Sequence, residues 1–327
     1  MVELAAAELF SADPSIRSVG VTRIGPSFGY HAVRNSAVIV PFGLAAPAEV
    51  QGIPVLYTET PGEIASLVRA PGLGPASPSA ASLVPEVLRQ RPLVGGLQIQ
   101  NFDDDDRQGD LQRGFIVIGT LSCFVRLADG RPALLSNNHV VAGENRGVRG
   151  SDRILQPGSL TFQAADQVAV LTDFVPLQFS PAGASPQAGT AVFNEVDAGV
   201  AALEAGTAFT QGYLPFRNLI APHATATASP GDQVFKVGRT TGLTFGEVTD
   251  VATIVGPVAY DPGPCWFRRS LVIEGISGTL FSDRGDSGSA IVRPNGEVVG
   301  ILYAGNGQQT YACPIDAVFS ALSCSLA

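Results

Sequence analysis

Basic residues are scarce in this chain, and lysine is almost absent. Its 327 residues include 29 Asp and Glu but only 20 Lys and Arg, with one lysine (Lys236), and the formal net charge is −9. Binding of nucleic acid requires a basic face, so we expect no nucleic-acid partner. Hydrophobic residues (45%) far exceed charged residues (15%), which excludes a disordered chain and is compatible with self-association without specifying an oligomer.

Long hydrophobic runs are also missing, since none approaches the ~20 residues needed to cross a bilayer. The first residues carry Glu3 and Glu8 where a secretory signal has a basic region, so we expect a cytoplasmic protein without membrane attachment. Cysteines are too few for a disulfide scaffold, and no Cys-x-x-Cys pair indicates a metal site. We expect reduced, mostly buried thiols at Cys123, Cys265, Cys313 and Cys324.

Glycine (37) and proline (24), by contrast, are abundant, which favours short strands joined by turns. The pattern over residues 1–70 predicts a small α/β subdomain, with a helix over 2–11 and strands over 18–24, 37–42 and 53–60. Residues 71–92 are rich in Pro, Ala and Ser, which is typical of a linker, with a short helix at its end.

From residue 93 onward, closely spaced strands come in two sets separated by a polar stretch. Two sets of about six strands predict two small antiparallel barrels, over 93–215 and 216–327, and the second ends in a short helix. The predicted fold class is therefore mainly β. The run Asp103 to Asp106 is interpreted as a solvated loop, because no spaced ligand loop accompanies it to make a calcium site.

A serine hydroxyl becomes a good nucleophile when a histidine accepts its proton and a carboxylate orients that histidine. Of the three histidines, His31 and His223 are interpreted as ordinary surface or turn residues. His139 follows a strand where small polar residues turn the chain, in ALLSNNHVVAG. The candidate carboxylate is Asp197, a lone acid leading into an apolar strand in FNEVDAGVAAL; capping of a turn is the alternative role.

The candidate nucleophile is Ser287, in the stretch GDSG. Gly285 lets the backbone bend so that the amides of residues 285 and 287 point at one spot, an oxyanion hole in which one donor contributes ~3–4 kcal/mol. His139, Asp197 and Ser287 follow the chain order of a chymotrypsin-type triad. The α/β-hydrolase alternative needs Gly-x-Ser-x-Gly and a later histidine, whereas residue 289 is Ser and no histidine follows Ser287.

Across about residues 95–327 the chain resembles a trypsin-like serine peptidase. The motifs that carry the resemblance are LSNNHVV, VGRTTGLTFGEV, FSDRGDSGSAIV and VVGILYAG, in the expected order. They are similar to a bacterial branch of these peptidases to which the plant NARROW LEAF 1 protease is related, and residues 1–90 resemble the extra N-terminal region of that branch. The resemblance implies a chymotrypsin-like double barrel, hydrolysis of a protein or peptide substrate through an acyl-enzyme, and no cofactor.

The same resemblance implies a substrate pocket with Phe281 at its base and walls from Tyr303, Ala304 and Gly305. A bulky apolar base predicts a preference for small or medium apolar side chains over Arg or Lys. Secreted relatives have a cysteine directly after the catalytic histidine, which would bridge a cysteine in the place of Cys123. Here Val140 follows His139, so that bridge cannot form.

In relatives activated by cleavage, the acid before the serine pairs with a newly freed amino terminus. Pro92 blocks ordinary cleavage after Arg91. We therefore expect Asp286 to be neutralised internally, by Arg284, Arg239 or Lys236.

Two functions remain open at this point. The first is a serine endopeptidase that performs limited proteolysis of a specific protein, using the triad and the amides of Gly285 and Ser287. The second is a catalytically silent or gated peptide-binding protein of the same fold, regulated by its N-terminal region.

Overall fold

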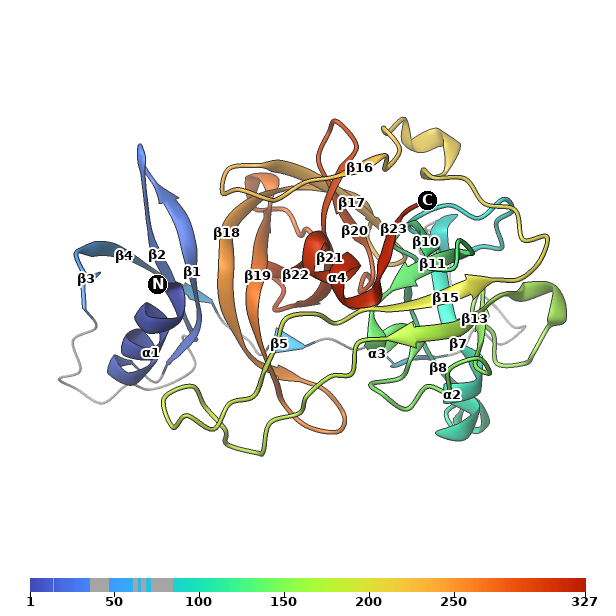
Figure 1. Cartoon of the computed structure of the whole chain (residues 1–327), viewed down its shortest axis with the longest axis horizontal. Coiled ribbons are helices and arrows are strands. Elements are labelled where there is room, and N and C mark those ends of the chain that lie inside the picture. Colours follow the sequence, from blue (N-terminus) through green and yellow to red (C-terminus); the bar gives the residue numbers. More distant parts are fainter. Residues whose placement is uncertain (14, 36–46, 61–63, 66–68, 72–84) are drawn as a thin grey trace.

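The computed structural model describes residues 1–13, 15–35, 47–60, 64–65, 69–71 and 85–327. The chain is mainly β, with two barrels and a short helix after the second, which confirms the predicted chymotrypsin-like fold class (Figure 1). Within the described ranges, no helix is both long enough and apolar enough to cross a membrane. All four cysteines are free thiols and three of them are buried, as predicted.

The first barrel is a sheet with the strand order β23-β10-β11-β15-β13-β12-β7-β9. The Leu121 amide donates to the carbonyl of Leu97, next to the pairing of β7 with β9, and the Ser122 amide donates to the carbonyl of Leu135 in β11. The continuous segment from β9 into β10 therefore closes the sheet on itself. Its strands are β7 (Gln98–Asn101), β9 (Gly119–Thr120), β10 (Phe124–Leu127), β11 (Pro132–Ser136), β12 (Arg153–Leu155), β13 (Gln167–Phe174), β15 (Gly199–Leu203) and β23 (Cys324–Leu326).

The second barrel has the order β19-β22-β21-β20-β17-β18, and pairing of β18 with β19 closes it. After β22, helix α4 (Ile315–Leu322) buries one apolar face, and the chain then crosses to the first barrel as β23. The barrel strands are β17 (Gln233–Gly238), β18 (Gly242–Ala259), β19 (Cys265–Gly275), β20 (Ala290–Val292), β21 (Glu297–Gly305) and β22 (Gln309–Pro314), with β14 (Phe193–Asn194) beside β19 and β16 (Ala224–Thr225) beside β21.

The N-terminal elements extend the sheet of the second barrel. Strand β1 pairs antiparallel with β18, with Ser18 opposite Val255, and the sheet continues in the order β18-β1-β2-β4-β3, left of the barrel in Figure 1. The predicted helix over 2–11 is confirmed as α1. Strand β2 was not predicted, and the predicted strand over 37–42 lies outside the described residues. The elements are α1 (Val2–Ala12), β1 (Ile16–Ile24), β2 (Ser27–Asn35), β3 (Glu49–Val50) and β4 (Ile53–Thr60).

Two short strands connect this region to both barrels. Strand β5 (Ile64–Ala65) runs parallel to the end of β18 and also pairs antiparallel with β21, where Ala65 lies opposite Gly305. Strand β6 (Arg69–Pro71) pairs antiparallel with β8 (Phe115–Val117), which precedes β9 of the first barrel. A 3-10 helix, Pro85–Val87, lies near the end of the expected linker.

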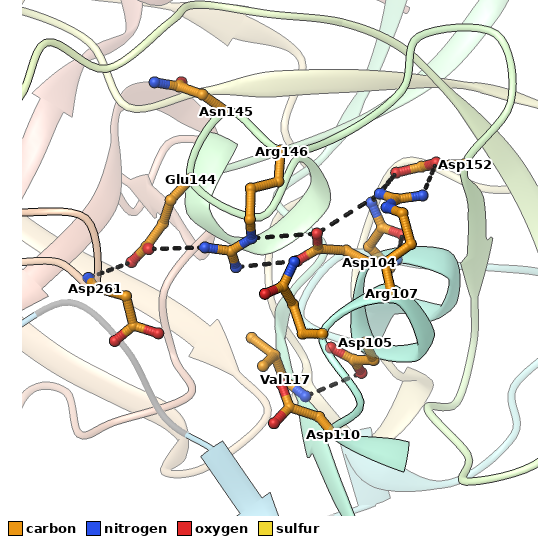
Figure 2. Close-up of polar contacts among 12 residues, drawn as sticks. Asp104, Asp105, Arg107, Asp110, Val117, Glu144, Asn145, Arg146, Asp152 and Asp261 are labelled. Carbon is orange, nitrogen blue, oxygen red and sulfur yellow. Dashed lines mark hydrogen bonds and ion pairs between the residues drawn. The ribbon is translucent and has the colours of Figure 1, made fainter. Parts of the chain in front are cut away.

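The interpretation of Asp103 to Asp106 as a solvated loop is wrong. These residues lie in helix α2 (Phe102–Arg107), and Asp104 and Asp105 are each only 2% exposed. Nη2 of Arg146 lies 3.1 Å from the Asp104 carboxylate (Figure 2). Arginines from distant parts of the sequence thus offset the buried negative charge, which a local reading of four acids does not reveal.

The interpretation of His31 as a surface or turn residue is also wrong. His31 is buried in β2, with Nδ1 2.8 Å from both carboxylate oxygens of Asp250 and Nε2 2.8 Å from the Thr58 hydroxyl. It therefore joins β2 to β18 and β4. His223 is exposed, as predicted.

Candidate active site

The end of strand β11 places His139. After Ser136 the chain enters the short helix α3 (Asn138–Val141), which carries His139. Nδ1 of His139 lies 2.5 Å from Oδ2 of Asp197, and the His139 amide donates to Oδ1 at 3.2 Å. Asp197 lies just before β15, the strand that pairs with β11, so the ladder between these strands sets the distance between the two side chains.

A pair of asparagines fixes the chain around α3. Nδ2 of Asn138 donates to Oδ1 of Asn145 and to the Val175 carbonyl, both at 2.7 Å, and the Asn145 amide donates back to Oδ1 of Asn138. Asn145 also donates to the Leu177 carbonyl. These bonds attach the loop after α3 to the segment after β13, which restrains the backbone that carries His139.

The loop with Ser287 comes from the second barrel and packs on the first. The Ser287 carbonyl accepts from the Thr120 amide at 2.8 Å, and the Gly285 carbonyl accepts from the Thr120 hydroxyl at 3.0 Å. A side chain at Gly119 would meet Val140 at 2.4 Å and the Ser287 carbonyl at 3.0 Å. The residue that follows His139 and the backbone of Ser287 therefore lie against the same point of β9.

Two positions in this loop require glycine. Gly285 (φ 97°) and Gly288 (φ 96°) have left-handed backbones that other residues rarely adopt. A Cβ at Gly288 would lie 2.1 Å from the Thr120 carbonyl, and one at Gly285 would lie 2.5 Å from the Thr240 hydroxyl. The GDSG sequence thus permits both the turn and its close approach to the first barrel.

Lys236 neutralises Asp286 from within the chain. Nζ of Lys236 lies 3.3 Å from Oδ2 of Asp286, and both side chains are fully buried. Of the other candidates, the Arg239 guanidinium donates to Gln98 instead, and Arg284 is exposed whereas Asp286 is buried. The Asp286 carboxylate also accepts hydrogen bonds from the backbone amides of Thr240, Thr241 and Asp283 and from the hydroxyl of Thr241.

One residue at the site was missed from the sequence. The Tyr260 hydroxyl donates to Oδ2 of Asp197 at 2.8 Å, and its ring meets the His139 ring edge-on with centroids 5.8 Å apart. Tyr260 begins the turn between β18 and β19, in the stretch AYDPGPC. The Pro-Gly-Pro run signals a turn, but nothing local to it indicates contact with an acid 63 residues earlier.

The candidate triad is enclosed by protein. His139 is 1% exposed, Ser287 is 4% exposed, and Asp197 is inaccessible. In the part of the chain that the structure describes, Nε2 of His139 is buried without a hydrogen-bond partner. Little of the surface of these three residues is therefore open to solvent in this structure.

The proposed pocket residues pack mainly into the second barrel. Phe281 is buried, its carbonyl accepts from the Thr244 hydroxyl, and its ring centroid lies 6.0 Å from Nζ of Lys236. The Tyr303 ring stacks on Phe267 at 4.3 Å and its hydroxyl bonds Ser270. Ala304 is buried and Gly305 is half-buried at the end of β21. Among the described residues, no cluster of three or more His, Cys, Asp or Glu side chains is arranged to hold a metal ion.

Comparisons with known proteins give a likeness of fold. No protein family and no curated protein matches the sequence. Nocardiopsis protease (NAPase) aligns over 72% of this chain and 98% of its own, with 16% identity and a TM-score of 0.47. Cellulomonas bogoriensis chymotrypsin aligns over 64% and 90%, with 17% identity and a TM-score of 0.42. Thermobifida fusca protease A aligns over 64% and 91%, with 15% identity and a TM-score of 0.43.

Proposed function

We propose that this protein is a serine endopeptidase that cleaves a specific protein substrate by limited proteolysis. The observation that carries the proposal is the 2.5 Å contact between Nδ1 of His139 and buried Asp197, beside the loop that bears Ser287. A buried carboxylate in this position holds the Nδ1–H tautomer, which leaves Nε2 as the proton acceptor. On its sequence motifs, we propose that the chain is similar to the bacterial branch of trypsin-like peptidases.

In the proposed reaction, Nε2 of His139 takes the proton of the Ser287 hydroxyl as Oγ attacks the scissile carbonyl carbon. The amides of Gly285 and Ser287 donate to the oxyanion that forms. The His139 imidazolium then protonates the leaving amine, which leaves an acyl-enzyme on Ser287. Water, deprotonated by His139, hydrolyses that ester and restores the serine. Catalytic hydrogen bonds of this kind commonly tighten only when substrate is bound.

The edge of β21 is the proposed place for the substrate backbone. The Gly288 amide bonds the Leu302 carbonyl, and the Leu302 amide bonds the Ser289 carbonyl, which brings Ser287 beside β21 just before Tyr303. An extended peptide can add to such an edge as a further strand. We propose that it pairs with Tyr303 to Gly305 and that Phe281 closes the base of its side-chain pocket.

A specific observation also favours gating by the N-terminal region. Ala65 already pairs with Gly305 on the proposed substrate edge, while His139 and Ser287 are buried. A strand in that place competes directly with a substrate strand. We therefore propose that strand β5 holds the peptidase in a closed state until it is displaced.

Fluorophosphonate labelling followed by intact-mass measurement tests the endopeptidase. We expect one adduct on the full chain, mapped to Ser287 and lost in Ser287→Ala and His139→Ala. The exposed Ser325 provides a matched control, because Ser325→Ala should label as wild type does. An adduct that persists in Ser287→Ala would refute the assignment of the nucleophile. Slow wild-type labelling that accelerates when β5 is displaced would identify the gated form.

A further inference from the structure

The buried charge of Asp197 depends on few donors. Its carboxylate is inaccessible to water, and burial of an ion is costly unless nearby groups stabilise it. Within the described ranges, Asp197 forms no ion pair with an arginine or a lysine, and its ion-pair partner is His139. Among the described residues, the Asp197 carboxylate accepts hydrogen bonds from the amide and Nδ1 of His139 and from the hydroxyl of Tyr260.

The Tyr260 hydroxyl donates to the same oxygen that faces the imidazole. Oδ2 of Asp197 lies 2.8 Å from the Tyr260 hydroxyl and 2.5 Å from Nδ1 of His139. The Tyr260 ring is buried between the rings of His139, Phe179 and Phe267. Burial and the charge of Asp197 raise the pKa of Tyr260 well above its usual value, so the phenol remains a hydrogen-bond donor.

A second contact anchors the turn that carries this tyrosine. The Asp261 amide donates to the carboxylate of Glu144 at 3.3 Å, and Arg146 joins Glu144 to Asp104 (Figure 2). Glu144 lies five residues after His139 and has a left-handed backbone (φ 56°). The turn after β18 is thus bonded both to Asp197 and to the loop that follows α3.

We propose that Tyr260 is a positioning residue of the triad, whose hydroxyl holds the Asp197 carboxylate in the orientation that presents Oδ2 to Nδ1 of His139. The second barrel thereby contributes to the His–Asp pair of the first barrel, in addition to supplying Ser287. This inference rests on the proposed peptidase function, but the geometry of the His–Asp pair can also be measured without turnover.

The experiment compares Tyr260→Phe with Tyr311→Phe in the full chain. Tyr311 is a matched control, since it is a fully buried tyrosine of the same barrel whose hydroxyl bonds Gln309 rather than the triad. For peptide hydrolysis we expect Tyr260→Phe to lower kcat by about 10- to 100-fold with KM unchanged, because one hydrogen bond to a charged group is lost. Tyr311→Phe should retain the wild-type kcat.

The pH profile separates positioning from a loss of packing. The titratable groups that face the His–Asp pair are Glu144 from the loop after α3, Tyr260 from the β18–β19 turn, Cys265 from β19, Tyr303 from β21 and Cys313 from β22. Loss of the phenol leaves more negative charge facing the imidazole, so the acid limb of kcat/KM should move to higher pH in Tyr260→Phe. Glu144→Gln removes a negative charge and should move that limb to lower pH.

A nuclear magnetic resonance measurement decides the inference independently of catalysis. The Nδ1 proton of His139, assigned by comparison with His139→Ala, should shift in Tyr260→Phe and stay unchanged in Tyr311→Phe. The same resonance position in wild type and Tyr260→Phe would overturn the role of Tyr260. A chain that shows the Nδ1 resonance but never labels at Ser287, even when Ala65→Pro displaces β5, would instead defeat the proposed function.

Discussion

Nζ of Lys236 lies 3.3 Å from the carboxylate of Asp286, and neither side chain has any contact with water. The acid beside the candidate nucleophile therefore has a cationic partner in the intact chain. Leu93, which would be the new terminus if the chain were cut between Pro92 and Leu93, is itself buried, and its amide donates to the Ala208 carbonyl. We infer that the GDSG loop is ordered without a cleavage step.

Replacement of Lys236 by methionine should disrupt this loop. Burial lowers the pKa of Lys236 while the charge of Asp286 opposes that change, and removal of one partner leaves the other charge buried alone. We expect Lys236→Met to lower the free energy of unfolding by ~3–5 kcal/mol and to abolish fluorophosphonate labelling. Urea denaturation and intact-mass labelling measure the two effects. The double variant Lys236→Met/Asp286→Asn should recover stability, and wild-type labelling of Lys236→Met would contradict the inference.

Asp105 should make the stability of the protein depend on pH. Its burial, with the charges of Asp104 and Asp110, raises its pKa to about 7 although Gln100 and the Val117 amide donate to it. The folded state thus holds a proton that the unfolded chain releases above its ordinary pKa of 3.8. Stability from this group is present at low pH and is lost as the pH rises from about 4 to about 7, by on the order of 4 kcal/mol.

The variant Asp105→Asn should therefore be more stable than wild type at pH 8 and should lose the fall in stability between pH 4 and pH 7. Its amide oxygen can still accept from Gln100 and Val117. Urea denaturation across this pH range provides the measurement. Asp106→Asn is the matched control, because Asp106 is exposed on the same helix and should leave the pH dependence intact. Parallel curves for wild type and Asp105→Asn would refute the prediction.

Displacement of β5 should open the enclosed site. Proline at position 65 removes a backbone donor from the strand that pairs with Gly305 and with β18. We expect Ala65→Pro to hydrolyse peptides several-fold faster than wild type, whereas Ala65→Ser retains the N–H group and should behave as wild type. Equal rates in all three proteins would show that β5 does not restrict access.

The substrate pocket should reject cationic side chains. Phe281 is buried and apolar, so an Arg or Lys side chain entering over its ring would lose hydration against an apolar surface. The nearby Lys236 already forms an ion pair with Asp286. We expect cleavage after small or medium apolar residues. Sequencing of the products from a peptide library provides the measurement, and strict cleavage after Arg or Lys would disprove this pocket.

The sequence predicted the features that depend on local pattern. Short strands between turns, the final amphipathic helix and the GDSG turn are set by residues near one another in the chain, and all are present. The sequence limited the partner of Asp286 to three candidate cations, and one of them, Lys236, forms the ion pair. Charge balance limited that choice, because a buried acid requires a compensating group.

The features that were missed depend on contacts between distant segments. His31 is buried because it bonds Asp250 of β18, two strands away, and Thr58 of the neighbouring β4. Helix α2 is buried because Arg146 and Arg153 reach it from other segments. Tyr260 contacts Asp197 because the turn after β18 extends over the first barrel. None of these pairings leaves a periodic or compositional signal, since each joins segments that are far apart in the sequence.

Because of strand β23, the first barrel cannot be completed before the second barrel has been synthesised. Arg126 in β10 of the first barrel pairs with Ser325, which follows helix α4 of the second barrel. A chain that emerges from the ribosome from its N-terminal end therefore exposes the edge of β10 until the whole second barrel has been made. Domains that fold during synthesis usually complete themselves in sequence order; here the first barrel to be synthesised is the last to acquire all its strands.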